Sequence, residues 1–438
     1  MAYDRQCISS ICMEGGNSLR GKICIQGSKN AALPELAASL LIPGVCVFKN
    51  IPGISDIECM ENLLRSTGAY LEERKEAYEL SVNAADIREY RLPARYVGAM
   101  RSSVVLMGAL LGRLGEALVD YPGGCVIGKR PIDLHLYGLE RLGARIWTDK
   151  SRIHAYADEL KGAAISFPFP SVGATQNTIL AAATARGTTV IKNAAREPEI
   201  TALCDFLNKA GAEIEIGGDF MAAGKIVIHG VDVSRLHGTE YEIIPDRIVA
   251  GTYMFAVLAA GGCVELENVP VAQLHSVCGI VERMGARISA NEEAGSLMVE
   301  AENKRDIKNV PFAETGAYPA FPTDLQSPLL ACSCVASGEL ELRERIFSSR
   351  FKIVEELVRM GADIELLDDD GVRVRGVKEL EGRTVIAREL RGGAALVIAG
   401  LAAKGITTVA DVSYIKRGYQ DIAGDLRKLG ARISYVDE

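Results

Sequence analysis

One segment of the sequence, residues 121–135, carries several groups that could transfer protons or form a covalent bond. It reads YPGGCVIGKRPIDLH, and its three glycines and two prolines are typical of an irregular loop. Cys125 lies close to Lys129 and Arg130, and positive neighbours favour the thiolate form of a cysteine. Cys125 is therefore a candidate acid, base or nucleophile, although its spacing alone fits a structural role as well.

Polar residues also stand at the start of six apolar segments that are rich in Ala and Leu. They are Lys29-Asn30, Arg101-Ser102, residues 171–175, Asp246-Arg247, Thr323-Asp324 and Arg391. A helix start has unpaired N–H groups and a partial positive charge, so several of them around one cleft would bind an anion. Each polar residue by itself also fits a simple helix cap. Because four of the six positions carry Lys or Arg, we expect a shared anion-binding cleft.

Two interleaved series of glycines place these helices in an internal repeat of about seventy residues. The first series ends amphipathic stretches with a Gly-Ala pair, at Gly68, Gly143, Gly211, Gly285, Gly361 and Gly430. The second ends the apolar segments, at Gly44, Gly115, Gly187, Gly262, Gly338 and Gly405. Glycine at a helix end suits a left-handed turn into a strand. The apolar segments predict buried helices, the amphipathic stretches predict surface helices, and six such α/β units indicate two domains of three units each.

Composition and charge argue against several classes of protein. The chain has 438 residues and a formal net charge of −8, which argues against a general nucleic-acid binder. Its 11 cysteines include no CxxC pair, and no His, Cys and carboxylate cluster has metal-ligand spacing. Residues 1–20 hold no signal-like apolar run, and no apolar stretch reaches membrane-spanning length. We therefore expect a cytoplasmic protein with reduced thiols and no membrane partner.

The loop sequence PGGCVIGKRPIDLH closely resembles the active-site loop of the UDP-N-acetylglucosamine 1-carboxyvinyltransferases. Six further motifs occur in the family's order: GSKNAALPELAASLL, SVGATQNTILAAA, NAAREPEI, PDRIVAGT, AFPTDLQ and IKRGYQDI. The resemblance extends over almost the whole chain. It implies a two-domain inside-out α/β barrel, in which each domain is a threefold repeat of a βα unit with buried helices. The implied domains are residues 29–244, and residues 1–28 together with residues 245–438.

The resemblance further implies an enolpyruvyl transferase that begins peptidoglycan synthesis and is a target of fosfomycin. Such an enzyme moves the enolpyruvyl group of phosphoenolpyruvate to the 3-hydroxyl of UDP-N-acetylglucosamine and releases phosphate. The reaction runs by addition and elimination through a tetrahedral ketal, and it requires no metal or organic cofactor. The two small molecules are therefore the expected partners, whereas the sequence leaves the oligomeric state open.

Residue by residue, the family's motifs imply catalytic roles for Cys125, Asp324, Lys29 and Arg417. Cys125 matches the loop cysteine that acts as a general acid, and Asp324 matches the carboxylate beside the reacting sugar hydroxyl. The residues expected to hold phosphoenolpyruvate are Lys29, Asn30, Arg130 and Arg417, with Arg391 and Arg247 as further cations at helix starts. The residues expected to contact the UDP-sugar are Arg101, Arg130, Pro131, Ile132, Asp133, Leu134, Ser171, Val172, Gly173, Asp324 and Ile346.

Four positions depart from the family pattern. Glu389 stands where Asp is usual, which would alter how Arg391 is held. Ser348 and Ser349 replace an acidic residue and Asn near the sugar site, and Phe169 replaces a Lys that some members carry for the nucleotide phosphates. These changes keep two alternatives open: a paralogue that uses a different nucleotide sugar, and an inactive paralogue that binds a UDP-sugar. The shikimate-pathway enzyme with the same fold lacks the PGGC loop.

Overall fold

The computed structural model describes residues 9–123, 131–149, 151–217, 220–302 and 306–437. Contacts between residues divide the chain into two compact units. We call residues 27–123 and 131–244 the central unit, and residues 9–26 with residues 245–437 the terminal unit. Each unit has its own hydrophobic core. Gly27 and Ser28, expected from the sequence in the other domain, belong to the central unit, because Gly27 packs against the main chain of Asn50 and the Ser28 N–H donates to the Ile244 carbonyl at 2.7 Å.

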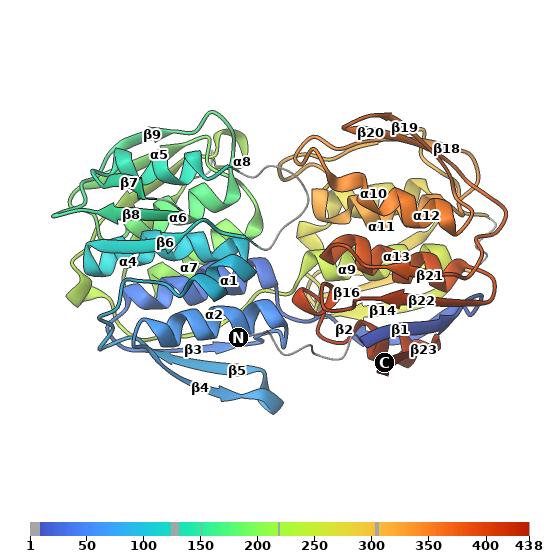
Figure 1. Ribbon diagram of the computed structural model, residues 1–438, viewed down its shortest axis with the longest axis horizontal. Coiled ribbons are helices and arrows are strands. Elements are labelled where there is room, and N and C mark those ends of the chain that lie inside the picture. Colours follow the sequence, from blue (N-terminus) through green and yellow to red (C-terminus); the bar gives the residue numbers. More distant parts are fainter. Residues whose placement is uncertain (1–8, 124–130, 150, 218–219, 303–305, 438) are drawn as a thin grey trace. The chain divides into compact units, whose positions relative to one another are not determined.

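Three β-sheets enclose the central unit (Figure 1). The first contains β11 (Glu213–Ile216), β12 (Ile226–His229), β10 (Thr188–Lys192) and β9 (Ala164–Ser166). The second contains β13 (Glu240–Glu242), β3 (Val45–Lys49), β5 (Glu79–Asn83) and β4 (Tyr70–Arg74). The third contains β6 (Glu116–Asp120), β8 (Arg152–Tyr156) and β7 (Arg145–Asp149), and a parallel bridge from Arg91 to Leu118 takes the place of a fourth strand.

Three sheets of the same kind form the terminal unit. The first contains β21 (Thr384–Ile386), β22 (Ile406–Ala410), β1 (Ser9–Glu14) and β23 (Arg432–Asp437). The second contains β15 (Arg287–Asn291), β16 (Ser296–Ala301), β14 (Gly262–Glu267) and β2 (Leu19–Cys24). The third contains β17 (Phe312–Glu314), β18 (Glu339–Arg343), β20 (Gly371–Arg375) and β19 (Asp363–Asp368). Each of these sheets combines one parallel pair of strands with antiparallel neighbours, as the first two sheets of the central unit do.

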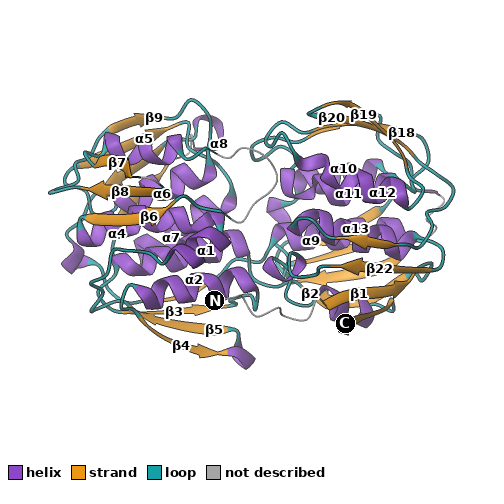
Figure 2. Cartoon of the chain, viewed as in Figure 1, coloured by secondary structure: helices purple, strands orange, loops and turns teal. Residues whose placement is uncertain are grey.

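The helices inside these sheets are buried, as the sequence predicts (Figure 2). They are α1 (Lys29–Ala38), α4 (Leu106–Leu114) and α6 (Val172–Ala182) in the central unit, and α9 (Arg247–Ala260), α11 (Gln326–Ser333) and α13 (Leu390–Ala402) in the terminal unit. Every residue of α9 and α11 is buried, which explains why these segments are apolar on all sides. In the terminal unit each of the three helices contacts the other two. The small residues allow close approach, since a Cβ on Gly108 of α4 would lie 2.2 Å from the Asn177 carbonyl of α6.

Amphipathic helices lie over these cores. They are α2 (Ser55–Ser66), α5 (Asp133–Arg141) and α7 (Pro198–Lys209) in the central unit, and α10 (His275–Arg283), α12 (Val354–Arg359) and α14 (Ile422–Lys428) in the terminal unit. Two short helices, α3 (Ala94–Ala99) and α8 (Phe220–Ala223), complete the described set. Among these helices, none combines the length and continuous apolar character that crossing a bilayer requires.

The predicted left-handed turns at the helix ends are confirmed. All six glycines of the Gly-Ala pairs have φ between +94° and +109°. In the second series, Gly115 caps α4, whereas Gly187, Gly338 and Gly405 have positive φ a few residues beyond their helix ends and Gly262 is the first residue of β14. Gly44 has no positive φ, because α1 ends at Ala38 and continues as a 3₁₀ turn over Ser39–Leu41. Glycine is needed there for a different reason, since a Cβ on Gly44 would lie 2.9 Å from the backbone nitrogen of Gly238.

The path of the chain explains why its two ends share a unit. In most repeats a short strand, a buried helix and a second strand follow one another within one unit, as in β9, α6 and β10. By contrast β2 is followed by α1 of the central unit, and β13 is followed by α9 of the terminal unit. Strand β2 pairs with β14 rather than with β3, so the N-terminal segment completes a repeat whose helix lies more than two hundred residues later.

Candidate active site

In the terminal unit, Asp324 lies between two buried arginines. It belongs to a 3₁₀ turn, η7 (Thr323–Leu325), directly before α11. Arg350 donates from Nη2 to Oδ1 at 2.8 Å, and Arg391 donates from Nη2 to Oδ2 at 3.1 Å. The side chains of Arg350 and Arg391 are 2% and 3% exposed, whereas that of Asp324 is 26% exposed. The carboxylate is thus the accessible part of an otherwise buried cluster.

The charge of this cluster is held in place by several groups. Burial opposes the charge on Arg391, but Asp324, Tyr419 and Asp246 favour it and the pKa of the guanidinium stays above its ordinary value. The guanidinium carbon lies 5.5 Å from the centroid of the Tyr419 ring. Neither the Nε of Arg350 nor that of Arg391 has a hydrogen-bond partner among the described residues. Two cations therefore hold one carboxylate at the start of α13, where Asp246 and the capping Glu389 add further negative charge.

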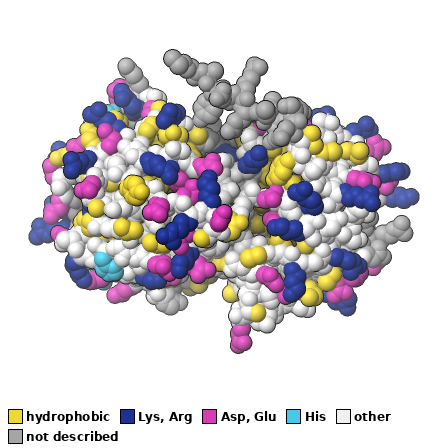
Figure 3. Space-filling view, turned by 90° about the horizontal axis from the view of Figure 1, so that it is seen from below, with side chains coloured by type: hydrophobic (Ala, Val, Ile, Leu, Met, Phe, Trp, Pro, Cys, Tyr) yellow, Lys and Arg dark blue, Asp and Glu magenta, His cyan; other side chains and the backbone are white. Residues whose placement is uncertain are grey.

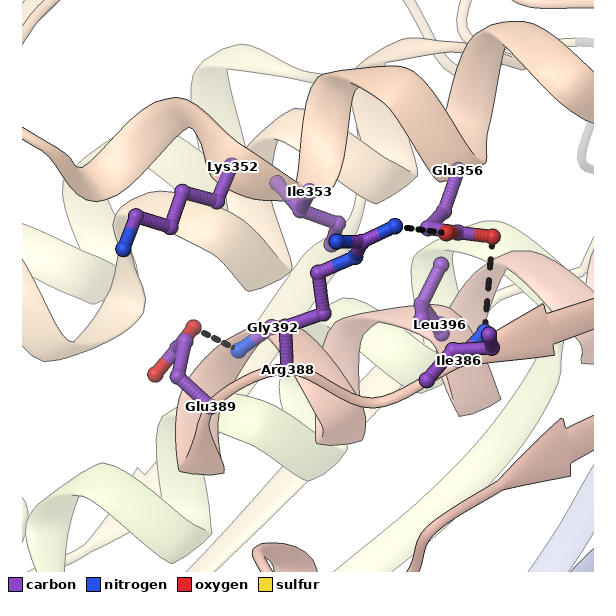
Figure 4. A pocket seen from close by; sticks show the side chains of 8 residues that line it. All are labelled: Lys352, Ile353, Glu356, Ile386, Arg388, Glu389, Gly392 and Leu396. Carbon is purple, nitrogen blue, oxygen red and sulfur yellow. Dashed lines mark hydrogen bonds and ion pairs between the residues drawn. The ribbon is translucent and has the colours of Figure 1, made fainter. Parts of the chain in front are cut away.

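Glu389, one of the departures from the family pattern, caps α13. Its Oε2 accepts the Arg391 N–H at 2.8 Å and its Oε1 accepts the Gly392 N–H (Figure 4). The longer side chain therefore binds the main chain of Arg391. Gly392 gives it room, because a Cβ at that position would lie 2.6 Å from Oε1 of Glu389. The predicted effect of Glu389 on Arg391 thus acts through the helix start.

A small pocket beside this helix start is lined by Lys352, Ile353, Glu356, Ile386, Arg388, Glu389, Gly392 and Leu396 (Figure 4). Its buried acid, Glu356, accepts hydrogen bonds from Arg388 at 3.3 Å, from Arg359 at 2.9 Å and from the Ile386 N–H at 3.3 Å. These bonds join α12 to β21 and to the segment before α13. Glu356 is therefore a structural residue that fixes the start of α13, and the bonds from Arg388 and Ile386 lie on the pocket wall.

Glu344 connects Asp324 with the predicted sugar-contacting loop, and sequence reasoning missed it. This buried residue follows β18; its Oε2 accepts from Thr323 Oγ1 at 2.9 Å, and its Oε1 accepts the N–H groups of Ile346 and Phe347 at 2.8 and 3.1 Å. The repeat could have revealed it. In four other repeats the residue after the corresponding strand is polar with φ near +55°: Asn50, Asn193, Asn268 and Asp411.

The other predicted cations of the terminal unit are Arg247 and Arg417. Arg247 is buried, and the preceding Asp246 caps α9 by accepting the N–H groups of Ile248 and Val249 at 2.8 and 3.1 Å. Arg417 ends a 3₁₀ turn, η9 (Ile415–Arg417), and is half-buried. Gln26 holds the segment after it, since its Nε2 donates to the Gly418 carbonyl at 3.3 Å and its Oε1 accepts the Gln420 N–H at 2.9 Å.

In the central unit, the predicted phosphate-binding lysine is paired with a buried acid. Lys29 is the first residue of α1, whose N-cap Ser28 accepts the Ala31 N–H at 3.3 Å. Its Nζ lies 2.7 Å from Oδ2 of Asp56, and the two side chains are only 10% and 6% exposed. Asn30, the adjacent predicted residue, is half-buried. Asp56 was not among the residues predicted from the sequence.

Arg101 binds the main chain on both sides of the Cys125 loop. It opens a 3₁₀ turn, η3 (Arg101–Val105), and donates to the carbonyl oxygens of Pro122 at 3.4 Å and Pro131 at 3.2 Å. Beyond Pro131, Ile132 is buried as the cap of α5, Asp133 is exposed and Leu134 is half-buried. Cys125 and Arg130 themselves lie outside the described residues, so their roles stay predictions.

The predicted sugar contacts at Ser171, Val172 and Gly173 form the first turn of α6. Ser171 caps the helix by accepting the Ala174 N–H at 3.4 Å. Gly173 must be small, because a Cβ there would lie 2.7 Å from Cε1 of buried His135. Just ahead, Phe169 is 45% exposed, and its carbonyl accepts the Ser171 N–H at 2.8 Å. An apolar ring therefore stands where some members of the resembled family carry a cation.

The orientation of His135 follows from its neighbour Asn177. The Asn177 Oδ1 accepts the Gly108 N–H at 2.6 Å, and its Nδ2 donates to the Val104 carbonyl at 3.1 Å. The same Nδ2 lies 3.2 Å from His135 Nδ1. Since an amide nitrogen donates, Nδ1 of His135 is the acceptor and the ring carries its proton on Nε2. This network fixes α4, α5 and α6 around the predicted sugar contacts.

The predicted site residues thus form two groups, one in each unit. Lys29, Asn30, Arg101 and residues 131–134 and 171–173 belong to the central unit, and Arg247, Asp324, Ile346, Arg391 and Arg417 belong to the terminal unit. Asp324 and Arg391 are in direct contact, as are Arg101 and Pro131. The described residues contain no cluster of three or more His, Cys, Asp or Glu side chains that could hold a metal ion. On the face drawn in Figure 3, acidic and basic side chains are interspersed.

Comparison with known proteins identifies the family. Residues 13–426 match the family described as EPSP synthase (3-phosphoshikimate 1-carboxyvinyltransferase). The chain belongs to this EPSP synthase family of carboxyvinyltransferases. Within the family, it is 43% identical over 430 residues to UDP-N-acetylglucosamine 1-carboxyvinyltransferase 1 of Symbiobacterium thermophilum, covering 96% of this chain and 94% of that protein. It is 42% identical to UDP-N-acetylglucosamine 1-carboxyvinyltransferase of Oleidesulfovibrio alaskensis, covering 98% and 100%.

A solved structure in the family supports the same architecture. The enolpyruvyl transferase NikO from Streptomyces tendae superimposes with a TM-score of 0.87 at 26% identity, covering 99% of this chain and 100% of NikO. The two-domain α/β fold expected from the sequence is therefore confirmed for this member of the EPSP synthase family.

Proposed function

We propose that this protein transfers the enolpyruvyl group of phosphoenolpyruvate to the 3-hydroxyl of UDP-N-acetylglucosamine and releases phosphate, the first committed step of peptidoglycan synthesis. The observation that carries the proposal is identity of 42–43% along nearly the whole chain to relatives named for this activity. The charged clusters of both units support it, because each presents fixed cations of the kind that bind a phosphorylated acid.

In the addition step, the sugar 3-hydroxyl oxygen bonds to C2 of phosphoenolpyruvate while C3 gains a proton. Asp324 is our choice as the base that takes the hydroxyl proton, and its carboxylate is the accessible member of its cluster. Two arginines donate to its oxygens and fix the position of the carboxylate. A weak base suffices, because the hydroxyl becomes acidic as its oxygen bonds to carbon. Cys125 is our choice as the acid that protonates C3.

In the elimination step, the tetrahedral ketal loses phosphate and one proton of its new methyl group, which restores the enol ether. The departing phosphate carries the negative charge that Lys29, Arg130 and Arg417 are proposed to bind, with Arg391 and Arg247 adding positive potential from the helix starts. Asn30 is proposed to assist Lys29. The balance is complete without a redox step, since no atom changes its oxidation state across the overall transfer.

The UDP-sugar is proposed to contact Arg101, residues 130–134, residues 171–173, Asp324 and Ile346. Phe169 removes one expected cation from this region, while Glu344 still fixes Ile346 next to Thr323 and Asp324. We therefore expect UDP-N-acetylglucosamine to bind more weakly than in members with Lys at this position. A preference for another nucleotide sugar is the second candidate function that Phe169 favours.

Steady-state phosphate release tests the proposal. Purified protein is assayed with phosphoenolpyruvate and UDP-N-acetylglucosamine, and the enolpyruvyl product is identified by mass spectrometry. Turnover with this pair supports the proposal, and turnover only with another nucleotide sugar would establish the second candidate. Tight sugar binding without phosphate release from any acceptor would show an inactive UDP-sugar-binding paralogue. Cys125→Ala serves as the control that should abolish release, because it removes the proposed acid.

We also propose a cytoplasmic location. The nine cysteines within the described residues are all free thiols, including four that are buried. Free thiols in this number are typical of a reducing compartment. Fractionation of the source cells tests the location, and recovery of the protein with the secreted fraction would contradict it.

A further inference from the structure

We propose that Asp56 is a positioning residue that holds the ammonium group of Lys29 in place for the phosphorylated substrate. The inference rests on the proposed function, and it assigns a role to a residue that none of the sequence motifs suggested. Its basis is the contact of 2.7 Å between Lys29 Nζ and Asp56 Oδ2 in a place where both side chains are almost fully buried.

Lys29 occupies a position that is unfavourable for a cation. It is the first residue of α1, where the helix carries its partial positive charge, and its side chain is shielded from water. Both effects disfavour an ammonium group. A carboxylate at hydrogen-bond distance offsets both effects, because it stabilises the charged form of the lysine and accepts one of the three N–H groups of the ammonium. Without Asp56, Lys29 would be a weaker and less ordered cation.

Asp56 occupies a position that is favourable for an anion. It lies in the first turn of α2, whose N-cap Ile54 provides no capping side chain, so the helix start is available to a carboxylate. Helices α1 and α2 contact each other, and the two residues therefore come from two buried helix starts that face one another. The pair places a negative charge at one helix start and a positive charge at the next.

This arrangement predicts which kinetic constant depends on Asp56. Lys29 is proposed to bind the phosphate or carboxylate of phosphoenolpyruvate and not the sugar, so a misplaced ammonium weakens that substrate selectively. A residue that only stabilised the fold would lower the yield or the melting temperature and would leave the ratio of the two Michaelis constants unchanged. The split between the constants therefore separates the two roles.

The experiment compares Asp56→Asn and Asp56→Glu with the parent enzyme and with Glu61→Gln. Glu61 is a matched control, because it lies on the same helix, is equally buried and pairs with Arg65 at 3.0 Å. We expect Asp56→Asn to raise KM for phosphoenolpyruvate about tenfold or more and to leave KM for UDP-N-acetylglucosamine within about twofold. Asp56→Glu keeps the charge and should recover most of the loss, and Glu61→Gln should change neither constant.

Each outcome of this experiment supports or overturns the role proposed for Asp56. Equal rises in both Michaelis constants, or no rise in either, would overturn the role of Asp56, as would an Asp56→Glu variant no better than Asp56→Asn. If Asp56→Asn does not fold, Asp56→Glu should still show a smaller rise confined to phosphoenolpyruvate, and its absence overturns the proposal. A parent enzyme that releases no phosphate defeats the proposed function itself, which distinguishes the two failures.

Discussion

The two units solve the problem of a buried charge in opposite ways. In the central unit one cation, Lys29, is held by one acid, Asp56. In the terminal unit one acid, Asp324, is held by two cations, Arg350 and Arg391. In the first arrangement, Asp56 serves to keep an ammonium in place. In the second, two guanidinium groups hold both oxygens of the one accessible carboxylate. The same threefold repeat thus yields a cation held by an acid in one unit and an acid held by cations in the other.

Removing Arg350 should break this comparison most severely. Arg350→Met leaves Asp324 with one arginine and places a thioether in a site that was 2% exposed. We expect kcat to fall about a hundredfold and the free energy of unfolding to fall by about 3 kcal/mol, as for other buried pairs that lose one partner. Urea unfolding and phosphate release measure the two effects. Arg345→Met is the control, since Arg345 pairs with Glu314 on the surface and should change neither. An unaltered Arg350→Met enzyme would show that the second cation is dispensable.

Arg417 tests whether the terminal unit shares the task proposed for Lys29. Arg417→Ala should raise KM for phosphoenolpyruvate about tenfold, because one charge-assisted hydrogen bond to phosphate is lost, with a smaller effect on the sugar. Steady-state kinetics with each substrate varied in turn provide the measurement. The neighbouring exposed Lys416 offers the matched substitution, Lys416→Ala, which should leave both constants unchanged. Equal rises for both substrates would remove the phosphate assignment from Arg417.

Glu35 sharpens the comparison, because this buried acid of α1 is paired with no lysine or arginine among the described residues. Both of its carboxyl oxygens are buried and find no hydrogen-bond partner among the residues that the structure describes. Burial, reinforced by Asp205 and Glu199, raises its pKa well above 4.5. The folded state then keeps a proton that the unfolded chain loses. Its contribution is therefore most favourable below pH 4.5 and is lost as the pH rises through the folded pKa.

Replacing Glu35 by Leu should stabilise the protein by about 1–3 kcal/mol, because an unpaired polar group gives way to an apolar one of similar size. The gain should be larger at pH 8 than at pH 5, where less of the penalty for ionisation applies. Urea unfolding of both proteins at the two pH values is the measurement. An equal gain in the free energy of unfolding at pH 5 and pH 8 would mean that Glu35 has the same protonation state in the folded and the unfolded chain.

The smallest expected effect concerns the start of α13, which positions Arg391. Gly392→Ala should destabilise the protein by about 1 kcal/mol, since its Cβ would crowd Oε1 of Glu389. In the Glu389→Asp background the same change should cost less or stabilise, because Asp is shorter and Ala favours a helix. A double-mutant cycle by thermal unfolding gives the coupling. Additive effects would show that Glu389 and Gly392 do not influence each other.

The sequence predicts the repeat because the repeat is local. Glycine spacing and all-round apolar segments follow from the geometry of single helices, and the positive φ at Gly68 and its equivalents agrees with them. Family motifs likewise point to Lys29, Asp324 and Arg391. The partners of these residues were missed, because Arg350 lies 26 residues from Asp324 and Asp56 belongs to a different helix from Lys29. Nothing in the local sequence around Asp56 or Arg350 marks either as buried; only the packing of separate repeats brings them to their partners.

The chain passes from one unit to the other after β2 and again after β13, and this path has a consequence for biosynthesis. The described residues of the central unit all lie between residues 27 and 244, so this unit can fold before the later strands of the terminal unit are made. Strands β1 and β2 are made before the central unit, whereas their partners β14, β22 and β23 are made after it. Strands β1 and β2 therefore wait with open edges during synthesis of the central unit, and the sheet of β1 closes only when β23 has been made.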